Sequence, residues 1–194
     1  MKDQKNIQEL VALAPDWMGM IFYEKSPRHL ELELELENKL KRIGVFVNAT
    51  EEYIDERIVK YGLSGIQFHG KETPAFCESY KAKGLTSIKA FSIDENFDFG
   101  LTKKYEESCH YFIFDTKGKN PGGNGVTYDW NILEKYKGET PFLLSGGIKV
   151  DMATVIKQFK HPRCVGVDIN SGFEIEPGLK NIELIKKFKH DLSN

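Results

Sequence analysis

Short apolar runs recur along the chain, and polar stretches with helical spacing separate them. The runs are rich in β-branched and aromatic side chains and too short for helices that stand alone, which is typical of strands. Because they are apolar nearly throughout, they predict strands buried on both faces, as in a parallel sheet. The seven predicted strands are residues 17–23, 43–48, 65–69, 86–91, 111–115, 141–145 and 164–168.

The polar stretches carry helix signals at both ends. Thr50 precedes one helical stripe that ends at Gly62, and Thr73 precedes another that ends at Gly84. Threonine side chains cap helix N-termini and glycine favours the C-terminal end, so both stretches predict helices. The chain therefore alternates strand and helix.

Two segments depart from this alternation. Residues 29–42 alternate Leu with Glu, a strand-like period of two, although their composition favours a helix. Since they join two strands expected to be parallel, we predict a short helix there. The first residues predict a helix that starts near Asp3 or Asn6 and has no strand before it.

Seven strands with intervening helices fit either an open doubly wound sheet or a (β/α) barrel that lacks one strand. The sequence has no GxGxxG fingerprint, which a doubly wound nucleotide binder should carry. Small residues instead follow the last two strands, with Gly146 and Gly147 in one loop and Ser171 and Gly172 in the other. Barrels bind phosphate with the loops after strands seven and eight. For either loop alone, a tight turn is the alternative explanation.

If the missing strand is the first, these two loops are the ones after strands seven and eight, which favours an α/β protein of the TIM (β/α)8 barrel type, with residues 1–194 forming a single domain. The other strand ends carry candidate chemistry. Asp115 lies beside apolar walls that would raise the pKa of its carboxyl group, which suits a general acid. Arg28 could hold a planar carboxylate, and His69 could hydrogen-bond a substrate. A turn-capping aspartate, a solvated arginine and a self-satisfied histidine are the alternatives. Lys89, inside an apolar strand, needs a partner or access to the pocket.

Composition narrows the function. Hydrophobic residues make up 40% of the chain and charged residues 29%, with a formal net charge of -2, which disfavours binding to nucleic acid. Cys77, Cys109 and Cys164 have no CxxC spacing and predict reduced thiols rather than a disulfide frame or a metal site. Neither a cationic leader nor an apolar run of about 18 residues is present, so we expect a cytoplasmic protein that does not enter a membrane.

Several motifs occur together, in order and with similar spacing, in one known family. The chain resembles phosphoribosylanthranilate isomerase of tryptophan biosynthesis from about Asp3 to the C-terminal helix. The motifs that carry the resemblance are YEKSPR, GVFVN, IQFHG, IKAF, FDTK with GGNGVTYDW, LLSGGI, and VDINSGFE with PGLKN.

The resemblance implies a (β/α)8 barrel and an aldose-ketose isomerisation that needs no cofactor. The family converts N-(5-phosphoribosyl)anthranilate, a small phosphorylated substrate, to 1-(2-carboxyphenylamino)-1-deoxyribulose 5-phosphate by an Amadori rearrangement. An acid protonates the furanose ring oxygen, the ring opens to a Schiff base, and a base removes the proton at C2 of the sugar. The resulting enolamine then tautomerises to the ketone.

The resemblance also assigns roles to residues of this sequence. It implies that Asp115 is the general acid, that Arg28 meets the anthranilate carboxylate, and that His69 and Asp168 lie in the pocket and near the sugar. The implied phosphate-binding residues are Gly146, Gly147, Ser171 and Gly172. The implied flexible loop contains Gly123 and Gly125.

The departure from the family lies at the N-terminus. Members open with a strand that ends in Cys-Gly, whose cysteine is the general base, and Met1 aligns just after that pair. The resemblance therefore implies that the first strand and the base are absent and that activity is impaired. Deleting a barrel strand exposes two sheet edges, and each buried unpaired group costs about 1–3 kcal/mol. We expect the native protein to carry about five to eight more residues, the usual length of a strand.

Other functions remain open at this point. A related sugar-phosphate isomerase of histidine biosynthesis is one, although the absence of a half-repeat and the SPR motif speak against it. A catalytically silent protein that binds phosphorylated ligands or stabilises a partner is another. We expect a monomer, with a strand supplied by a neighbouring chain as the alternative.

Overall fold

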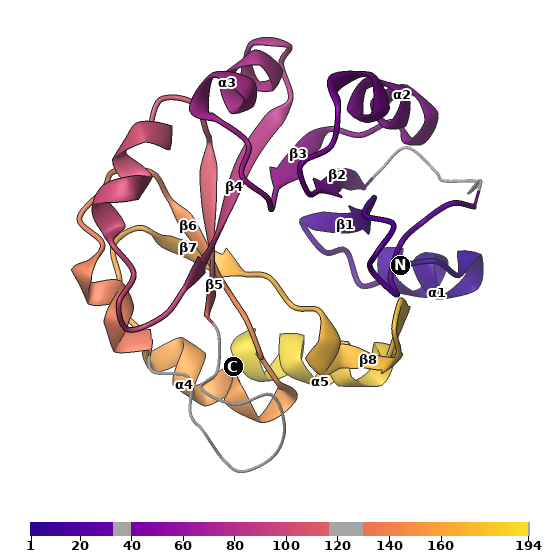
Figure 1. Cartoon of the computed structure of the whole chain (residues 1–194). Helices are drawn as coiled ribbons and strands as arrows, with labels where there is room; N and C mark the ends of the chain where they lie inside the picture. Colours follow the sequence, from indigo (N-terminus) through magenta and orange to yellow (C-terminus); the bar gives the residue numbers. More distant parts are fainter. Residues whose placement is uncertain (33–39, 117–129, 194) are drawn as a thin grey trace.

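The computed structural model describes residues 1–32, 40–116 and 130–193, and the bounds of its elements confirm the seven predicted strands to within two residues at each end. The strands pair in parallel and in chain order, so that each strand lies beside the next one in the sequence. The sheet curls, and the helices lie on its outer side (Figure 1). The strands are β1 (Trp17–Ile21), β2 (Lys41–Phe46), β3 (Gly65–Phe68), β4 (Thr86–Ile93), β5 (Tyr111–Thr116), β6 (Phe142–Ser145) and β7 (Cys164–Val167).

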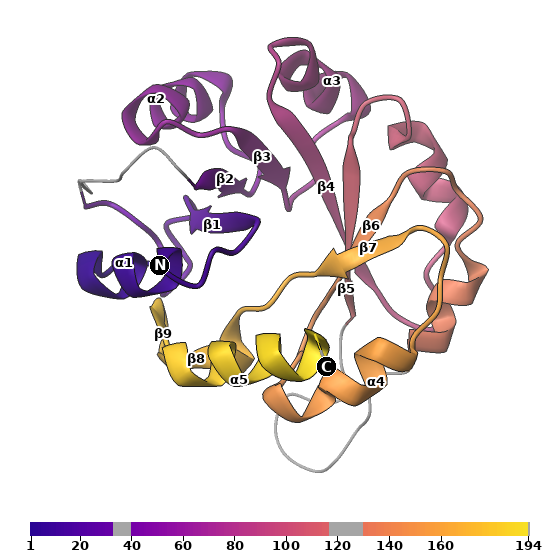
Figure 2. The ribbon, with the colours of Figure 1, turned by 180° about the vertical axis from the view of Figure 1, so that it is seen from behind.

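Helices connect the strands from β2 to β7, and a small hairpin follows the last one. From the opposite side, helix α5 and the hairpin lie below β7 and reach toward α1 (Figure 2). The α-helices are α1 (Gln4–Val11), α2 (Glu51–Tyr61), α3 (Pro74–Ala82), α4 (Ala153–Gln158) and α5 (Ile182–Ser193). The 3-10 helices are η1 (Phe99–Tyr105), η2 (Trp130–Lys135), η3 (Val150–Met152) and η4 (Ser171–Phe173), and the hairpin is β8 (Glu174–Glu176) and β9 (Leu179–Lys180). In the described part of the chain, no helix is long and apolar enough to cross a membrane.

The predicted helix caps are confirmed. Asp3 accepts a hydrogen bond from the backbone N–H of Asn6 at 2.7 Å, which starts α1. Thr50 and Thr73 do the same for α2 and α3. Gly62 ends α2 in the left-handed conformation, with φ of 57°, which glycine adopts without a steric cost.

The core lies on both faces of the sheet, which explains why the strands are apolar nearly throughout. The outer layer, between sheet and helices, is rich in aromatic rings such as Phe46, Phe68 and Phe114. The inner layer is smaller and holds Ile43, Ile88, Ala90 and Ile113, with Trp17, Tyr111 and Leu143 packed against it.

A buried ion pair joins β4 to the loop after β3. The Lys89 ammonium lies 3.4 Å from the Glu72 carboxylate, and each side chain is 3% exposed. Lys89 also donates to the carbonyl of Gly70 at 2.8 Å, and Glu72 accepts from the backbone N–H groups of Asn48 and Gly70 at 2.7 and 2.9 Å. This cluster fixes the segment around His69, and it provides the partner that Lys89 needs.

Two predictions are corrected. The helix predicted over residues 29–42 does not extend to Lys41 and Arg42, which belong to β2 because their strand pairs with β1; residues 33–39 lie outside the described residues. The predicted missing first strand is not confirmed. Within the described residues, the sheet starts with β1, ends with β7 and contains seven parallel strands. The structure is therefore an α/β fold whose parallel sheet curls as in a barrel.

Candidate active site

Four polar side chains lie at the C-terminal ends of strands β3, β5, β6 and β7. His69 follows β3, Asp115 lies near the end of β5, Ser145 ends β6, and Asp168 follows β7. The Nε2 atom of His69 lies 3.7 Å from Oδ2 of Asp115, and the Ser145 hydroxyl donates to Oδ2 of Asp168 at 3.2 Å. These strand ends meet at one edge because the strands are parallel, as in the active sites of barrels. The structure thus brings together the three site residues predicted at these strands.

Asp168 has a perturbed carboxyl group. Burial raises the pKa of Asp168 above its usual value of 3.8, and the nearby charge of Asp115 raises it further. The hydrogen bond from Ser145 and the electrostatic effects of Lys180 and His69 lower the pKa of Asp168 but do not reverse the shift. The Asp168 carboxyl group therefore holds a proton more readily than an exposed aspartate does.

We expect the substitution Asp168→Asn to stabilise the fold at neutral pH by about 1 kcal/mol, as the removal of a strained functional charge commonly does. A carboxyl group whose folded pKa is raised binds its proton more tightly in the folded state, so the wild-type stability falls as pH rises from the unfolded pKa through the folded one. Urea unfolding at pH 7 and below about pH 4 checks this. The gain should vanish at the lower pH, and a loss of stability at pH 7 would contradict it.

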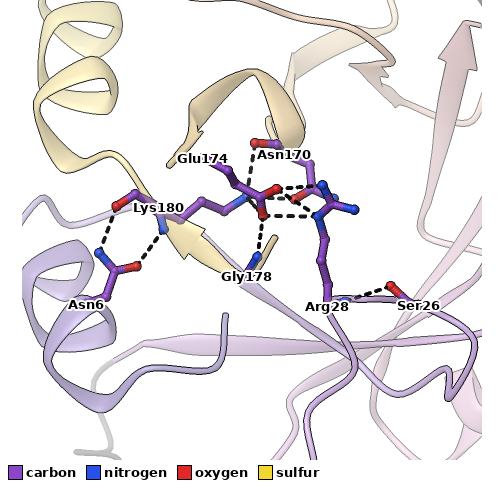
Figure 3. Close-up of polar contacts among 7 residues, drawn as sticks. All are labelled: Asn6, Ser26, Arg28, Asn170, Glu174, Gly178 and Lys180. Carbon is purple, nitrogen blue, oxygen red and sulfur yellow. Dashed lines mark hydrogen bonds and ion pairs between the residues drawn. The ribbon is translucent and has the colours of Figure 1, made fainter. Parts of the chain in front are cut away.

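Arg28 follows β1, and its guanidinium pairs with Glu174 at the start of β8 (Figure 3). Its Nε and Nη2 atoms donate to Oε2 of Glu174 at 2.8 and 2.6 Å. The motif analysis did not single out Glu174 or Lys180, which also contacts this carboxylate at 3.1 Å. The need of a strand-end arginine for an anionic partner was the signal that could have pointed to an acidic residue.

The two glycine loops contact each other. Gly146 and Gly147, after β6, have φ values of 91° and 58°, a conformation that glycine adopts readily. A side chain on Gly172, after β7, would bring its Cβ to 2.1 Å from the carbonyl oxygen of Ile148, so only glycine fits there. Ser171 is exposed and begins η4 beside this contact. The loops predicted to share a phosphate are therefore neighbours in space.

Some sequence predictions do not fall at this edge. Gly123 and Gly125 lie within residues 117–129, outside the described residues. Cys77 on α3 and Cys109 before β5 are buried, and Cys164 is the first residue of β7, at the opposite end of the strand from Asp168. No group of three or more His, Cys, Asp or Glu side chains among the described residues is arranged to hold a metal ion.

This edge combines acid and base groups with N–H donors that are able to contact anions. Asp115, Asp168 and His69 can exchange protons with a bound molecule. Arg28 adds a fork of N–H donors, and the glycine loops add backbone donors of the kind that bind phosphate.

Comparison with known proteins identifies relatives along nearly the whole chain. Residues 1–191 match the family described as N-(5'-phosphoribosyl)anthranilate (PRA) isomerase. The N-(5'-phosphoribosyl)anthranilate isomerase of Parabacteroides distasonis is 48% identical over 195 residues, covering 97% of this chain and 88% of the relative. That of Phocaeicola vulgatus is 44% identical over 193 residues, covering 99% and 94%.

Solved structures agree with this assignment. The crystal structure of phosphoribosyl anthranilate isomerase from Thermotoga maritima is similar with a TM-score of 0.84 and 29% identity, covering 100% of this chain and 95% of that one. A crystal structure of this isomerase in complex with reduced 1-(o-carboxyphenylamino)-1-deoxyribulose 5-phosphate gives a TM-score of 0.82 and 26% identity over the same shares. With its matched residues and its curled parallel sheet, this chain belongs to the PRA isomerase family.

Proposed function

We propose that this chain is an aldose-ketose isomerase that converts N-(5-phosphoribosyl)anthranilate to 1-(2-carboxyphenylamino)-1-deoxyribulose 5-phosphate in tryptophan biosynthesis. The observation that carries the proposal is the position of Asp115. Its Oδ2 atom lies 3.7 Å from Nε2 of His69, at the edge of the sheet where the two glycine loops begin. Membership of the family and the names of the relatives support it.

In the proposed mechanism, the Asp115 carboxylic acid gives its proton to the furanose ring oxygen. The bond between C1 and this oxygen breaks while the anthranilate nitrogen shares its lone pair with C1, which forms a protonated Schiff base. A base removes the proton at C2, which gives the enolamine. A proton then adds to C1 while the C2 hydroxyl loses its own proton, which gives the ketone. A carboxyl group acting as a general acid typically accelerates such a step about 10²- to 10⁴-fold.

The other site residues bind and orient the substrate in this proposal. Arg28 meets the anthranilate carboxylate, since its planar fork suits a planar anion. Gly146, Gly147, Ser171 and Gly172 hold the phosphate. His69, beside Asp115, and Asp168 face the sugar between these two anchors.

We further propose that turnover by these 194 residues alone is low, because the family's general base is a cysteine and the three cysteines of this sequence lie away from the candidate site. A chain extended by a strand ending in Cys-Gly should turn over about 10²-fold faster than the same extension ending in Ala-Gly, the usual worth of a general base. Steady-state assays of both extended chains and of the printed chain check this. Equal rates for the two extensions would contradict it.

Growth of a strain that lacks the isomerase tests the function itself. The Cys-Gly extended chain should restore growth without tryptophan, and the Asp115→Asn form of that chain should not. Binding of the reduced product without any turnover would favour the silent phosphate-binding alternative, and restored growth without histidine in the corresponding strain would favour the sugar-phosphate isomerase.

A further inference from the structure

The Glu174 carboxylate contacts Arg28 and is almost inaccessible to solvent. Its side chain is 4% exposed, whereas that of Arg28 is 21% exposed. Oε2 of Glu174 accepts from Nε and Nη2 of Arg28, and Oε1 accepts from the backbone N–H of Gly178 and from the Lys180 ammonium, both at 3.1 Å (Figure 3). The carboxylate is thus fixed from three directions, and the arginine is the accessible partner.

The pairing with Glu174 uses one edge of the Arg28 guanidinium and leaves the other edge available for a ligand. A guanidinium has five N–H donors in a rigid fork. Glu174 takes the edge formed by Nε and Nη2, and among the described residues Nη1 of Arg28 makes no hydrogen bond. The end formed by Nη1 and the second Nη2 hydrogen is therefore held in a defined direction, with donors for one more carboxylate.

Lys180 compensates the charge of Glu174, but it has no N–H group left to donate to a ligand. Its ammonium donates to the carbonyl and the side-chain oxygen of Asn170 at 3.1 and 2.7 Å, and to Glu174, which accounts for its three N–H groups. The cluster of Arg28, Glu174 and Lys180 carries two positive charges and one negative charge. Its net charge of about +1 attracts an anion, which an isolated arginine and glutamate pair would not do.

The Glu174 carboxylate stays ionised and in place, whereas burial lowers the pKa of its partner Lys180 below the usual value. Burial on its own would raise the pKa of Glu174, but the hydrogen bond from Arg28 and the charge of Lys180 outweigh it and lower the pKa below its usual value. The backbone of Lys180 is also held, since its N–H and carbonyl bond the side chain of Asn6 at 2.7 and 2.8 Å. Glu174 is therefore an ionised side chain on a hairpin whose position is fixed by hydrogen bonds.

We propose that Glu174 is a positioning residue for the substrate carboxylate: it holds Arg28 in the orientation that receives this group, and Lys180 keeps the cluster cationic. This inference rests on the proposed function, in which Arg28 meets the anthranilate carboxylate. Without Glu174, the Arg28 side chain would sample several orientations until the substrate binds. Substrate binding would then cost the conformational entropy of ordering this side chain, which weakens binding.

Calorimetric binding of two ligands tests the proposal without requiring turnover. One ligand is reduced 1-(o-carboxyphenylamino)-1-deoxyribulose 5-phosphate, and the other is the same compound without the carboxylate. Glu174→Gln should raise the Kd of the first ligand about tenfold and leave that of the second within about twofold, because only the first uses the fork of Arg28. Glu174→Asp, which keeps the charge but draws it back from Arg28, should give a smaller change in the same direction.

A double-mutant cycle with Arg28→Ala separates positioning from general support of the fold. In the Arg28→Ala background, Glu174→Gln should have no further effect on the Kd of the carboxylated ligand. Equal weakening of both ligands, or tighter binding of the carboxylated ligand to Glu174→Gln, would overturn the proposal, the latter because Glu174 would then be a competitor for Arg28. Wild-type protein that binds neither ligand would instead show that the proposed function itself is wrong.

Discussion

Replacing Asp115 by Asn in the chain extended by a strand that ends in Cys-Gly is expected to lower kcat about 10²- to 10⁴-fold, the usual contribution of a general acid. The amide has nearly the shape of the carboxyl group but cannot give a proton to the ring oxygen. The Kd of the reduced product should change by less than about threefold, since the proposed function assigns the substrate's carboxylate and phosphate to other residues. Steady-state kinetics and calorimetry on the same preparations measure both quantities.

Asp16→Asn is the matched control for this variant. Asp16 is exposed and precedes β1, at the end of the sheet opposite Asp115. Its substitution changes the net charge by the same amount and should leave kcat unchanged. If Asp115→Asn retains more than about a tenth of the wild-type kcat, proton donation by Asp115 is excluded, because that loss is smaller than acid catalysis supplies.

Lys89→Met is expected to destabilise the fold by about 3–5 kcal/mol, the cost of removing one partner from a buried ion pair. The methionine fits the apolar surroundings of β4, but it leaves the Glu72 carboxylate, which is 3% exposed, without its ammonium partner. Urea unfolding at neutral pH measures the loss. The same substitution at Lys83, whose side chain is 41% exposed and pairs with Glu51 and Asp55, should cost less than about 1 kcal/mol.

The double variant Lys89→Met with Glu72→Gln shows whether the loss comes from the unpaired charge. Glutamine keeps an oxygen that can accept from the N–H of Asn48 or Gly70 and brings no charge into the interior. The double variant should therefore be more stable than Lys89→Met alone. A double variant that is no more stable than Lys89→Met would show that the lost ammonium contacts to Phe68 and Gly70, and not the unpaired charge, determine the effect.

The strands and caps could be predicted from sequence because their causes are local. An apolar run between two polar stretches is sufficient for a buried parallel strand, and Thr50 or Thr73 contacts an N–H only three residues away. The positions of His69 and Asp115 followed from the same reasoning, since residues at the ends of parallel strands share one edge, whereas Asp168 came from the family resemblance.

Partners across the fold could not be predicted in this way. The position of Lys89 in an apolar strand required a partner, but several acidic residues were eligible and only the structure identifies Glu72. Arg28 and Glu174 are separated by 146 residues, and no local pattern connects them. Gly172 was selected as a phosphate-loop residue, yet its closest constraint is the carbonyl of Ile148, which depends on how two loops pack.

The hydrogen bonds between Asn6 and Lys180 have a consequence for the order of folding. They join residues 174 positions apart, so they close nearly the whole chain into a loop. Contacts of such long sequence separation cost the most chain entropy and form slowly. Refolding chains should therefore regain their helical content before the hairpin that carries Glu174 docks against α1. Recognition of the carboxylate is expected to be among the last properties that a newly made molecule acquires.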